Sequence, residues 1–254
     1  MGKADLHVHS IYSPDSGSTV RAVLKQAQDA GLDVLAITDH DEMRGSLQAR
    51  TLAPKYGLEA VPGVEVTTGE GHLVALYIEK LPPSGMPLVD TLLWIRDQGG
   101  LAIAAHPFTT LPQSLSMEAV LGALIHPVAK LALKGIEVNN MSTSAFNATV
   151  QKVANFLPLA PIASSDSHVY WTVGSAYTEF SGSTAADLRT ALEICATTPV
   201  PYDGKFKGRH FLSWIRYMAL RRFGFASDNI SPGTPVTIQR VTRPILNNKK
   251  KTND

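Results

Sequence analysis

The feature that most constrains this chain is a short apolar segment that ends on histidine or on a carboxylate and recurs along the sequence. The first example runs from Asp5 to His9. Because side chains alternate between the two faces of a strand, Asp5, His7 and His9 share one face and Leu6 and Val8 share the other. Each buried imidazole needs partners for both ring nitrogens, and a metal ion meets that need directly. The alternative is a half-exposed strand whose histidines bind water. The two interpretations differ in whether the rest of the chain supplies further metal ligands.

Six further apolar segments follow the first one and alternate with segments of helical periodicity. Such alternation favours parallel strands, in either a doubly wound sheet or a closed barrel. Polar residues follow the carboxyl ends of at least five strands, which is where barrel enzymes place their sites, so we predict an α/β barrel. The predicted strands are 5–9, 34–38, 59–64, 73–77, 101–105, 135–138 and 161–165, and the predicted helices lie at about 20–30, 45–56, 92–95, 117–133, 147–156 and 185–195.

Length and cysteine content narrow the possible sites. A chain of 254 residues is within the range of one large barrel domain. Cys195 is the only cysteine, which excludes a disulfide framework and a cysteine-based zinc site. No apolar run reaches the roughly 18 residues that span a bilayer, and the N-terminus does not read as a signal peptide. We therefore expect a soluble, cytoplasmic protein that holds any metal through His, Asp and Glu.

Nine residues at the predicted strand ends are candidate metal ligands. The set combines imidazoles with carboxylates, which favours Zn²⁺, Mn²⁺ or Fe²⁺ over Ca²⁺. One ion uses roughly three to six ligands, so nine candidates indicate a cluster of two or three divalent ions with a bridging carboxylate or hydroxide. The candidates are His7, His9, Asp15, His40, Glu65, His72, His106, Asp166 and His168.

Five short motifs recur at the predicted strand ends. They are Asp5-Leu6-His7-Val8-His9-Ser10, Thr38-Asp39-His40-Asp41, Gly63-Val64-Glu65, His106-Pro107 and Asp166-Ser167-His168. Together these motifs resemble the polymerase and histidinol phosphatase (PHP) family of metal-dependent phosphoesterases, and the resemblance covers roughly residues 3–200. It implies a distorted seven-stranded (β/α) barrel similar to a TIM barrel, with a trinuclear metal centre.

The resemblance also implies how the nine residues divide among three ions. Glu65 would bridge two of them. Divalent ions lower the pKa of a bridging water to about 7, so the expected nucleophile is a metal-bound hydroxide held by Glu65 and Asp166. The implied sets are His7, His9, Glu65 and Asp166 for the first ion, Glu65, His72 and His106 for the second, and Asp15, His40 and His168 for the third.

Four polar residues near the motifs are weaker candidates for supporting roles. Asp39 is a candidate for orienting a ligand histidine, and Asp41 and Arg44 are candidates for contacting the substrate. Asp5 is predicted to accept a hydrogen bond from a ligand histidine, as carboxylates beside metal sites commonly do.

Three other polar residues are left outside the predicted site. Glu137 ends no strand cleanly and is expected only to cap or to pair. His126 precedes a proline but lies in a predicted helical region. We interpret His126 and His210 as structural or exposed.

The C-terminal part differs in charge from the rest of the chain. Residues 1–204 contain 12 Lys or Arg and 20 Asp or Glu, whereas residues 205–254 contain 11 Lys or Arg and 2 Asp or Glu. An acidic body suits a cation-binding cavity, and a basic end suits an anionic partner or solvent. We expect a PHP metallo-hydrolase barrel over 1–200 and a basic helical extension over 201–254.

The extension contains one segment with an apolar stripe. Residues 205–225 are expected to form a helix that packs on the outside of the barrel. Two alternatives are a basic, aromatic surface for nucleotide or nucleic-acid phosphates and an interfacial membrane helix. Residues 247–254 are expected to be disordered.

The resulting functional hypothesis is a metal-dependent phosphoric ester hydrolase. Its expected substrate is a nucleotide, an RNA end or a small phosphorylated metabolite. Related chains often carry a helical insertion between the motifs of Glu65 and His106, but only 40 residues separate those positions here, which predicts an open site. The alternatives are a histidinol-phosphate phosphatase and a non-catalytic PHP domain that serves as a structural or nucleic-acid interaction module.

Overall fold

A computed structural model describes residues 1–110, 113–141 and 144–202, and residues 215, 219, 225–227 and 238–240 of the C-terminal part. In that part, β11 (Phe225–Ser227) pairs in antiparallel fashion with β12 (Ile238–Arg240). Most of the predicted helix over 205–225 lies outside the described residues. His210 and the segment 247–254 also lie outside them.

The first sheet is built around the N-terminal strand and has the order β10-β9-β1-β2-β3. β1 pairs in parallel with β2, and β2 pairs in parallel with β3. β9 runs antiparallel to both of its neighbours, β1 and β10. The strands are β1 (Gly2–Val8), β2 (Val34–Ile37), β3 (Glu59–Ala60), β9 (Tyr177–Phe180) and β10 (Thr197–Val200).

The second sheet has the order β4-β5-β6-β7-β8. β5 is antiparallel to both β4 and β6, whereas β6, β7 and β8 are parallel. The strands are β4 (Gly63–Thr67), β5 (His72–Leu76), β6 (Leu101–Ala104), β7 (Leu133–Asn140) and β8 (Ala160–Ser164). Two isolated parallel bridges link this sheet to the first one: Val8 pairs with Ser167, and His40 pairs with Glu65.

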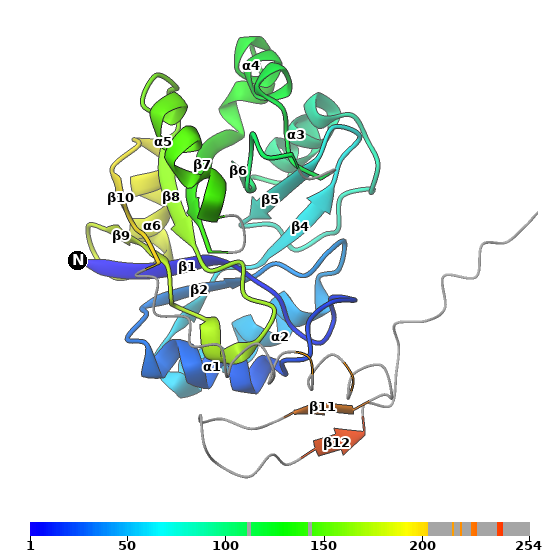
Figure 1. Cartoon of the computed structure of the whole chain (residues 1–254), viewed down its shortest axis with the longest axis vertical. Coiled ribbons are helices and arrows are strands. Elements are labelled where there is room, and N and C mark those ends of the chain that lie inside the picture. Colours follow the sequence, from blue (N-terminus) through cyan, green and yellow to red (C-terminus); the bar gives the residue numbers. More distant parts are fainter. Residues whose placement is uncertain are drawn as a thin grey trace, which may run out of the picture.

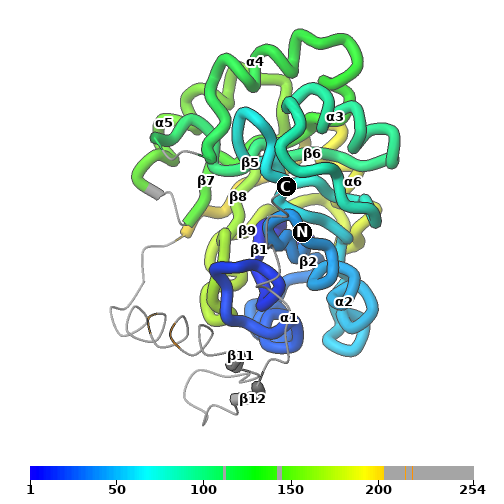
Figure 2. The backbone as a smooth tube through the Cα atoms, turned by 90° about the vertical axis from the view of Figure 1, so that its right-hand side faces the viewer, coloured from blue at the N-terminus to red at the C-terminus, as the bar shows by residue number. Residues whose placement is uncertain are grey.

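Helices cover the outer sides of the two sheets. α1 and α2 lie along the sheet that contains β1 and β2, and α3, α4 and α5 lie on the far side of the second sheet (Figures 1 and 2). The helices are α1 (Val20–Asp29), α2 (Arg44–Leu52), α3 (Leu88–Asp97), α4 (Met117–Ile125), α5 (Asn147–Ala154) and α6 (Ala185–Glu193), and the short 3₁₀ helices are η1 (Ala53–Tyr56), η2 (Ala129–Leu131), η3 (Ser144–Phe146) and η4 (Tyr170–Thr172).

Three apolar clusters fill the spaces between these layers. The middle cluster includes Leu6 of the first sheet and Ile103 of the second, so it lies between the sheets. A second cluster joins Leu35 to α1, and a third joins Val66 to α3. Most strands are therefore covered on both faces, which explains why they read as continuous apolar runs in the sequence.

The structure corrects the prediction of seven parallel strands in one closed barrel. The described residues form a mixed α/β fold with two five-stranded sheets, and no closed barrel is found among them. The segment 59–64 splits into β3 and β4 around Pro62, which has no N–H to donate to a ladder. β5 turns back on β4 through a four-residue connection, which is too short for a parallel crossover.

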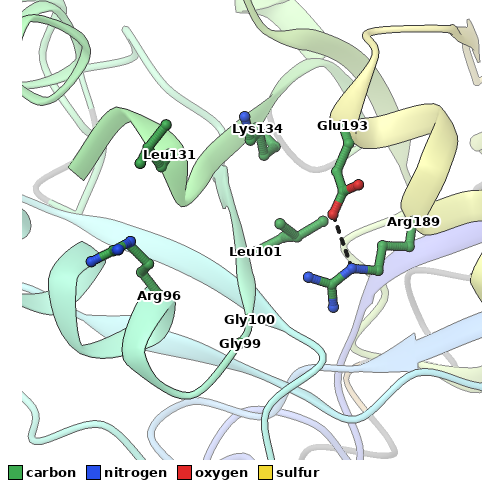
Figure 3. A pocket seen from close by; sticks show the side chains of 8 residues that line it. All are labelled: Arg96, Gly99, Gly100, Leu101, Leu131, Lys134, Arg189 and Glu193. Carbon is green, nitrogen blue, oxygen red and sulfur yellow. Dashed lines mark hydrogen bonds and ion pairs between the residues drawn. The ribbon is translucent and has the colours of Figure 1, made fainter. Parts of the chain in front are cut away.

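A hollow opens at the amino ends of β6 and β7, away from the carboxyl ends of these strands (Figure 3). Its lining includes Leu101 on β6, Lys134 on β7 and Arg96 on α3. At its edge, Arg189 Nε donates to Glu193 Oε1 over 3.0 Å. None of the nine predicted ligands lines this hollow, so it is separate from the predicted metal site.

None of the described helices has both the length and the hydropathy that a bilayer crossing requires.

Candidate metal centre

Glu65 lies at the centre of the polar cluster formed by the strand ends. It belongs to β4 and is fully buried. Five imidazoles surround its two carboxylate oxygens. Oε2 lies 3.2 Å from His7 Nε2, 3.4 Å from His9 Nε2 and 2.9 Å from His40 Nδ1, and Oε1 lies 2.8 Å from His72 Nδ1 and 3.1 Å from His106 Nε2.

Asp166 approaches the same cluster from the segment that follows β8. Its Oδ1 lies 3.6 Å from His7 Nε2, 3.3 Å from His9 Nε2 and 3.7 Å from His168 Nδ1. The backbone of Asp166 has a φ of +48°, a region that is uncommon for residues other than glycine. Such strained conformations concentrate at functional sites, where the surrounding structure imposes them.

Asp15 closes the cluster on its solvent side. Its Oδ2 lies 3.2 Å from His40 Nε2 and 3.2 Å from His168 Nε2. These three side chains are partly exposed, at 43% for Asp15, 19% for His40 and 23% for His168, whereas those of His7 and His9 are fully buried. The cluster therefore has a closed inner part and an outer part that a solute can reach.

All nine predicted ligand residues meet in this cluster. They form four overlapping groups in which the potential ligand atoms lie within 4.8 Å of one another. Several of these atoms are buried and form no hydrogen bond in the described part of the chain, among them His7 Nε2, His9 Nε2, His72 Nδ1 and Glu65 Oε2. The groups are His9, Asp15, His40 and His168; His7, His9 and Asp166; His7, Glu65 and His106; and His40, Glu65 and His72.

Buried ring nitrogens that face carboxylate oxygens without forming hydrogen bonds fit divalent ions placed between them. Glu65 belongs to two of the four groups, which fits a carboxylate shared between ions. The donor set therefore suits the metal ions that the sequence predicts.

The ionisable groups of the cluster perturb one another strongly. Burial tends to raise the pKa of Glu65, but the surrounding histidines, His7 foremost, bring it well below its ordinary value. Burial tends to lower the pKa of His40, but Asp15 and Glu65 raise it to about 10. Burial, with the neighbouring His168, lowers the pKa of His9 to about 4. Without ions, protons on some of the imidazoles therefore balance the negative charge of the carboxylates.

Hydrogen bonds to the second ring nitrogen orient several of these imidazoles. His9 Nδ1 lies 2.9 Å from Ser13 Oγ, and His168 Nδ1 lies 3.0 Å from the carbonyl oxygen of Asp166. In each ring, Nε2 is left to face the cluster. This arrangement is common among histidines that ligate metals.

Asp39 and Asp5 make contacts other than the predicted ones. Asp39 was expected to orient a ligand histidine, but its carboxylate accepts hydrogen bonds from Ser10 N at 2.6 Å and Ser10 Oγ at 2.7 Å. The Asp5 carboxylate was expected to hold an imidazole, but it accepts hydrogen bonds from Ser165 and Gly174 instead. Both residues hold together the loops that carry the cluster.

The two substrate-contact candidates make structural contacts. Asp41 Oδ1 accepts from Thr67 N and Asp41 Oδ2 accepts from Ser84 Oγ, both at 2.9 Å. The exposed Arg44 pairs with Glu42 and lies over the ring of Tyr12, 5.0 Å from its centroid. A role of Asp41 and Arg44 with substrate stays a prediction.

Glu137, which was expected only to cap or to pair, is buried in β7 and reaches the cluster. Its Oε1 lies 2.9 Å from His7 Nδ1. The carboxylate inside the apolar segment 135–138 could have indicated a buried partner for Glu137, because an uncompensated charge is costly there. His126 has the structural role expected of it, because its Nδ1 accepts from the backbone N–H of Val128 and Ala129 at the end of α4.

Family models match most of the described chain. The model of the PHP domain matches residues 5–117, and a second model, described as PHP-associated, matches residues 145–194. The first match includes seven of the nine clustered residues, and the second contains Asp166 and His168.

Known proteins similar to this chain include three relatives and one solved structure. The uncharacterized protein MJ1587 of Methanocaldococcus jannaschii is 34% identical over 66% of this chain and 98% of the relative. A phosphoribosyl 1,2-cyclic phosphate 1,2-diphosphodiesterase of Eggerthella lenta is 35% identical over 38% of this chain and 39% of the relative. A 5'-3' exoribonuclease of Haemophilus influenzae is 33% identical over 40% of this chain and 38% of the relative.

The solved structure is a Bacteroides vulgatus two-domain protein containing a predicted PHP-like metal-dependent phosphoesterase. It is 19% identical and aligns with a TM-score of 0.63 over 93% of this chain and 74% of that chain. At this identity the likeness concerns the fold. The family-model matches, together with the similarity to MJ1587 over 98% of that relative, establish that this chain belongs to the PHP domain family.

Proposed function

We propose that this protein is a metal-dependent phosphoesterase that hydrolyses phosphate esters at the cluster around Glu65. The observation that carries the proposal is the meeting of nine histidine and carboxylate side chains from several strands and the segments beside them, with potential ligand atoms within 4.8 Å of one another in each group. A buried assembly of this kind is costly unless ions compensate its charges.

The chain's own residues would hold two or three divalent ions. Glu65 would be shared between ions, with His7, His9 and Asp166 on one side and His72 and His106 on the other. Asp15, His40 and His168 would form the outer group. Such ions make water acidic enough to act as a nucleophile near neutral pH and neutralise phosphate oxygens.

The partial exposure of the outer group indicates where a substrate would approach. Asp15, His40 and His168 face solvent, whereas His7 and His9 are shielded. A phosphoryl group would therefore enter from the side of Asp15. The buried inner residues would hold the ions in place and exclude bulk water, which strengthens electrostatic interactions at the site.

The choice of first substrates follows from the relatives and from the openness of the site. One relative is named as a cyclic-phosphate diesterase and another as an exoribonuclease, so diesters and RNA ends are the first classes to test. Nucleotides and small phosphorylated metabolites, histidinol phosphate among them, form the second class. Because a DNA polymerase is among the relatives, the competing hypothesis is a non-catalytic, nucleic-acid-binding role.

The test combines elemental analysis with turnover in the same preparation. We expect two or three ions per chain, and hydrolysis of a generic phosphate monoester or diester that depends on added Mn²⁺. The variants His7→Ala and Asp166→Ala should remain folded and lose turnover. Bound metal without hydrolysis of any class would favour the non-catalytic role, and absence of both under metal-replete conditions would overturn the proposal.

A further inference from the structure

Glu137 accepts four hydrogen bonds at the edge of the cluster, although it belongs to none of the four potential ligand groups. Its Oε1 accepts from His7 Nδ1 at 2.9 Å and from Ser164 Oγ, and its Oε2 accepts from His106 N at 2.7 Å and from Asn140 Nδ2 at 2.9 Å. We infer that Glu137 is a positioning residue that sets the geometry of His7 and His106 toward the metal ions. The inference rests on the proposed function.

The contact with His7 determines which ring nitrogen faces the cluster. A neutral imidazole has one N–H and one lone pair. With the N–H on Nδ1 donated to Glu137, the lone pair belongs to Nε2, which lies 3.2 Å from Glu65 Oε2 and 3.6 Å from Asp166 Oδ1. Glu137 thus fixes both the orientation and the tautomer of His7.

The contact with His106 acts on the backbone rather than on the ring. His106 has a φ of +28°, which a non-glycine residue adopts only when its surroundings impose it. The hydrogen bond from its N–H to Glu137 supports this conformation, and it leaves the ring with Nε2 3.1 Å from Glu65 Oε1. One carboxylate therefore holds two imidazoles that come from β1 and from the end of β6.

Only a carboxylate can satisfy these four donors. Asn140 Nδ2 also donates to Asp166, so its bond to the cluster fixes the orientation of the Asn140 amide. A glutamine at position 137 would place an NH₂ group against either His7 Nδ1 and Ser164 or His106 N and Asn140. In the first orientation the amide favours the tautomer of His7 that carries its N–H on Nε2. In the second orientation the amide N–H groups face the N–H donors of His106 and Asn140.

The test measures metal affinity rather than turnover. Wild-type protein and Glu137→Gln are stripped of metal and titrated with Zn²⁺ against a chromophoric chelator. We expect the variant to bind Zn²⁺ about 10 to 100 times more weakly, the usual cost of losing a residue that orients a ligand. The control is Leu192→Ala, which removes a buried side chain of α6. It should melt at a lower temperature and keep wild-type Zn²⁺ affinity.

A second variant keeps the test decisive if Glu137→Gln does not fold. Ser164→Ala removes one donor to Glu137 and should weaken Zn²⁺ binding about two- to tenfold in a folded protein. Wild-type affinity in a folded Glu137→Gln or in Ser164→Ala would overturn the inference while leaving the proposed function intact. Absence of Zn²⁺ binding by the wild-type protein would overturn both.

Discussion

At the scale of single residues, the chemistry of this protein concentrates on one carboxylate. Glu65 has five imidazole nitrogens within 3.4 Å of its two oxygens, and these come from four different parts of the fold. A side chain in that position cannot be exchanged for one that lacks charge without changing every neighbouring group. Its role is therefore open to a direct test.

Replacing Glu65 by glutamine should abolish the shared ligand. We expect Glu65→Gln to retain at most half of the wild-type metal content and to lose turnover by at least about 100-fold, because the amide brings an N–H donor toward the imidazoles. Elemental analysis and a phosphoesterase assay check this. The matched control is Glu79→Gln on the surface, where Glu79 pairs with the exposed Arg50. Equal metal content in both variants would contradict the role given to Glu65.

The affinity for metal should rise with pH. Burial works against protonation of His168, but Asp15 and Asp166 raise its pKa to about 9, and the pKa of His40 is about 10. Both imidazoles are therefore protonated at pH 7 in the metal-free protein, and an ion must displace their protons. Calorimetric titration from pH 6 to pH 9, in buffers of different ionisation enthalpy, should show proton release and tighter binding at higher pH. An affinity that does not change over this range would contradict the account.

The candidate ligands could be predicted from the sequence because most of them lie at or next to the ends of apolar runs. Their side chains, such as His106 after 101–105, stand out where a strand stops. Glu137 could not be predicted in the same way, because it lies within a strand and its partners His7, His106 and Ser164 are far away in the sequence. Asp39 and Asp5 were predicted to contact imidazoles, but sequence spacing does not show which loop a buried carboxylate holds.

At the scale of elements, six of the seven predicted strands are present as single strands and the segment 59–64 is divided between β3 and β4, so the arrangement differs from the prediction. Apolar runs identify strands that are covered on both faces. This criterion does not identify β9, whose burial alternates along the strand, or β10, which is partly exposed. Both strands include polar residues, and β10 also contains Pro199. The antiparallel direction of β5 depends on pairing between segments, which local periodicity does not specify.

The close approach of α2 to the strand ends makes one glycine indispensable. A Cβ at Gly45 would collide with Asp39 Oδ2 and would lie 2.6 Å from Ser10 Oγ. We expect Gly45→Ala to lower the free energy of unfolding by about 1–3 kcal/mol, the usual cost of overpacking. Chemical denaturation measures this.

Gly122 in α4 is the matched control for that substitution. Among the described residues, a Cβ there meets no heavy atom within 4 Å beyond its chain neighbours and the backbone of its own helix. Gly122→Ala should therefore raise stability by about 0.5–1 kcal/mol through helix propensity alone. A shift of the denaturation midpoint in the same direction for both substitutions would contradict the described packing of α2 against Asp39.

At the scale of the whole molecule, the cluster ties the two sheets together. The bridges from Val8 to Ser167 and from His40 to Glu65 both lie at residues that flank or belong to it. Ions bound there would link β1, β4 and the segment after β8. Metal binding should therefore stabilise the fold as a whole.

Removal of metal should lower the melting temperature. An ion present at 100 times its dissociation constant stabilises the folded state by about 2.7 kcal/mol, so chelation should produce a clear shift that added Mn²⁺ reverses. Differential scanning calorimetry measures it. His7→Ala should show a smaller response to chelator than the wild-type protein, and an equal response would place the stabilising ion elsewhere.

The central claim is that nine side chains gathered from several strands and the segments beside them hold metal. It is tested most directly by anomalous diffraction from crystals grown with Mn²⁺. The account predicts two or three anomalous peaks within coordination distance of the cluster around Glu65, with Asp15, His40 and His168 around the outermost. Well-ordered crystals with no peak at the cluster, or with peaks only at other residues, would contradict it.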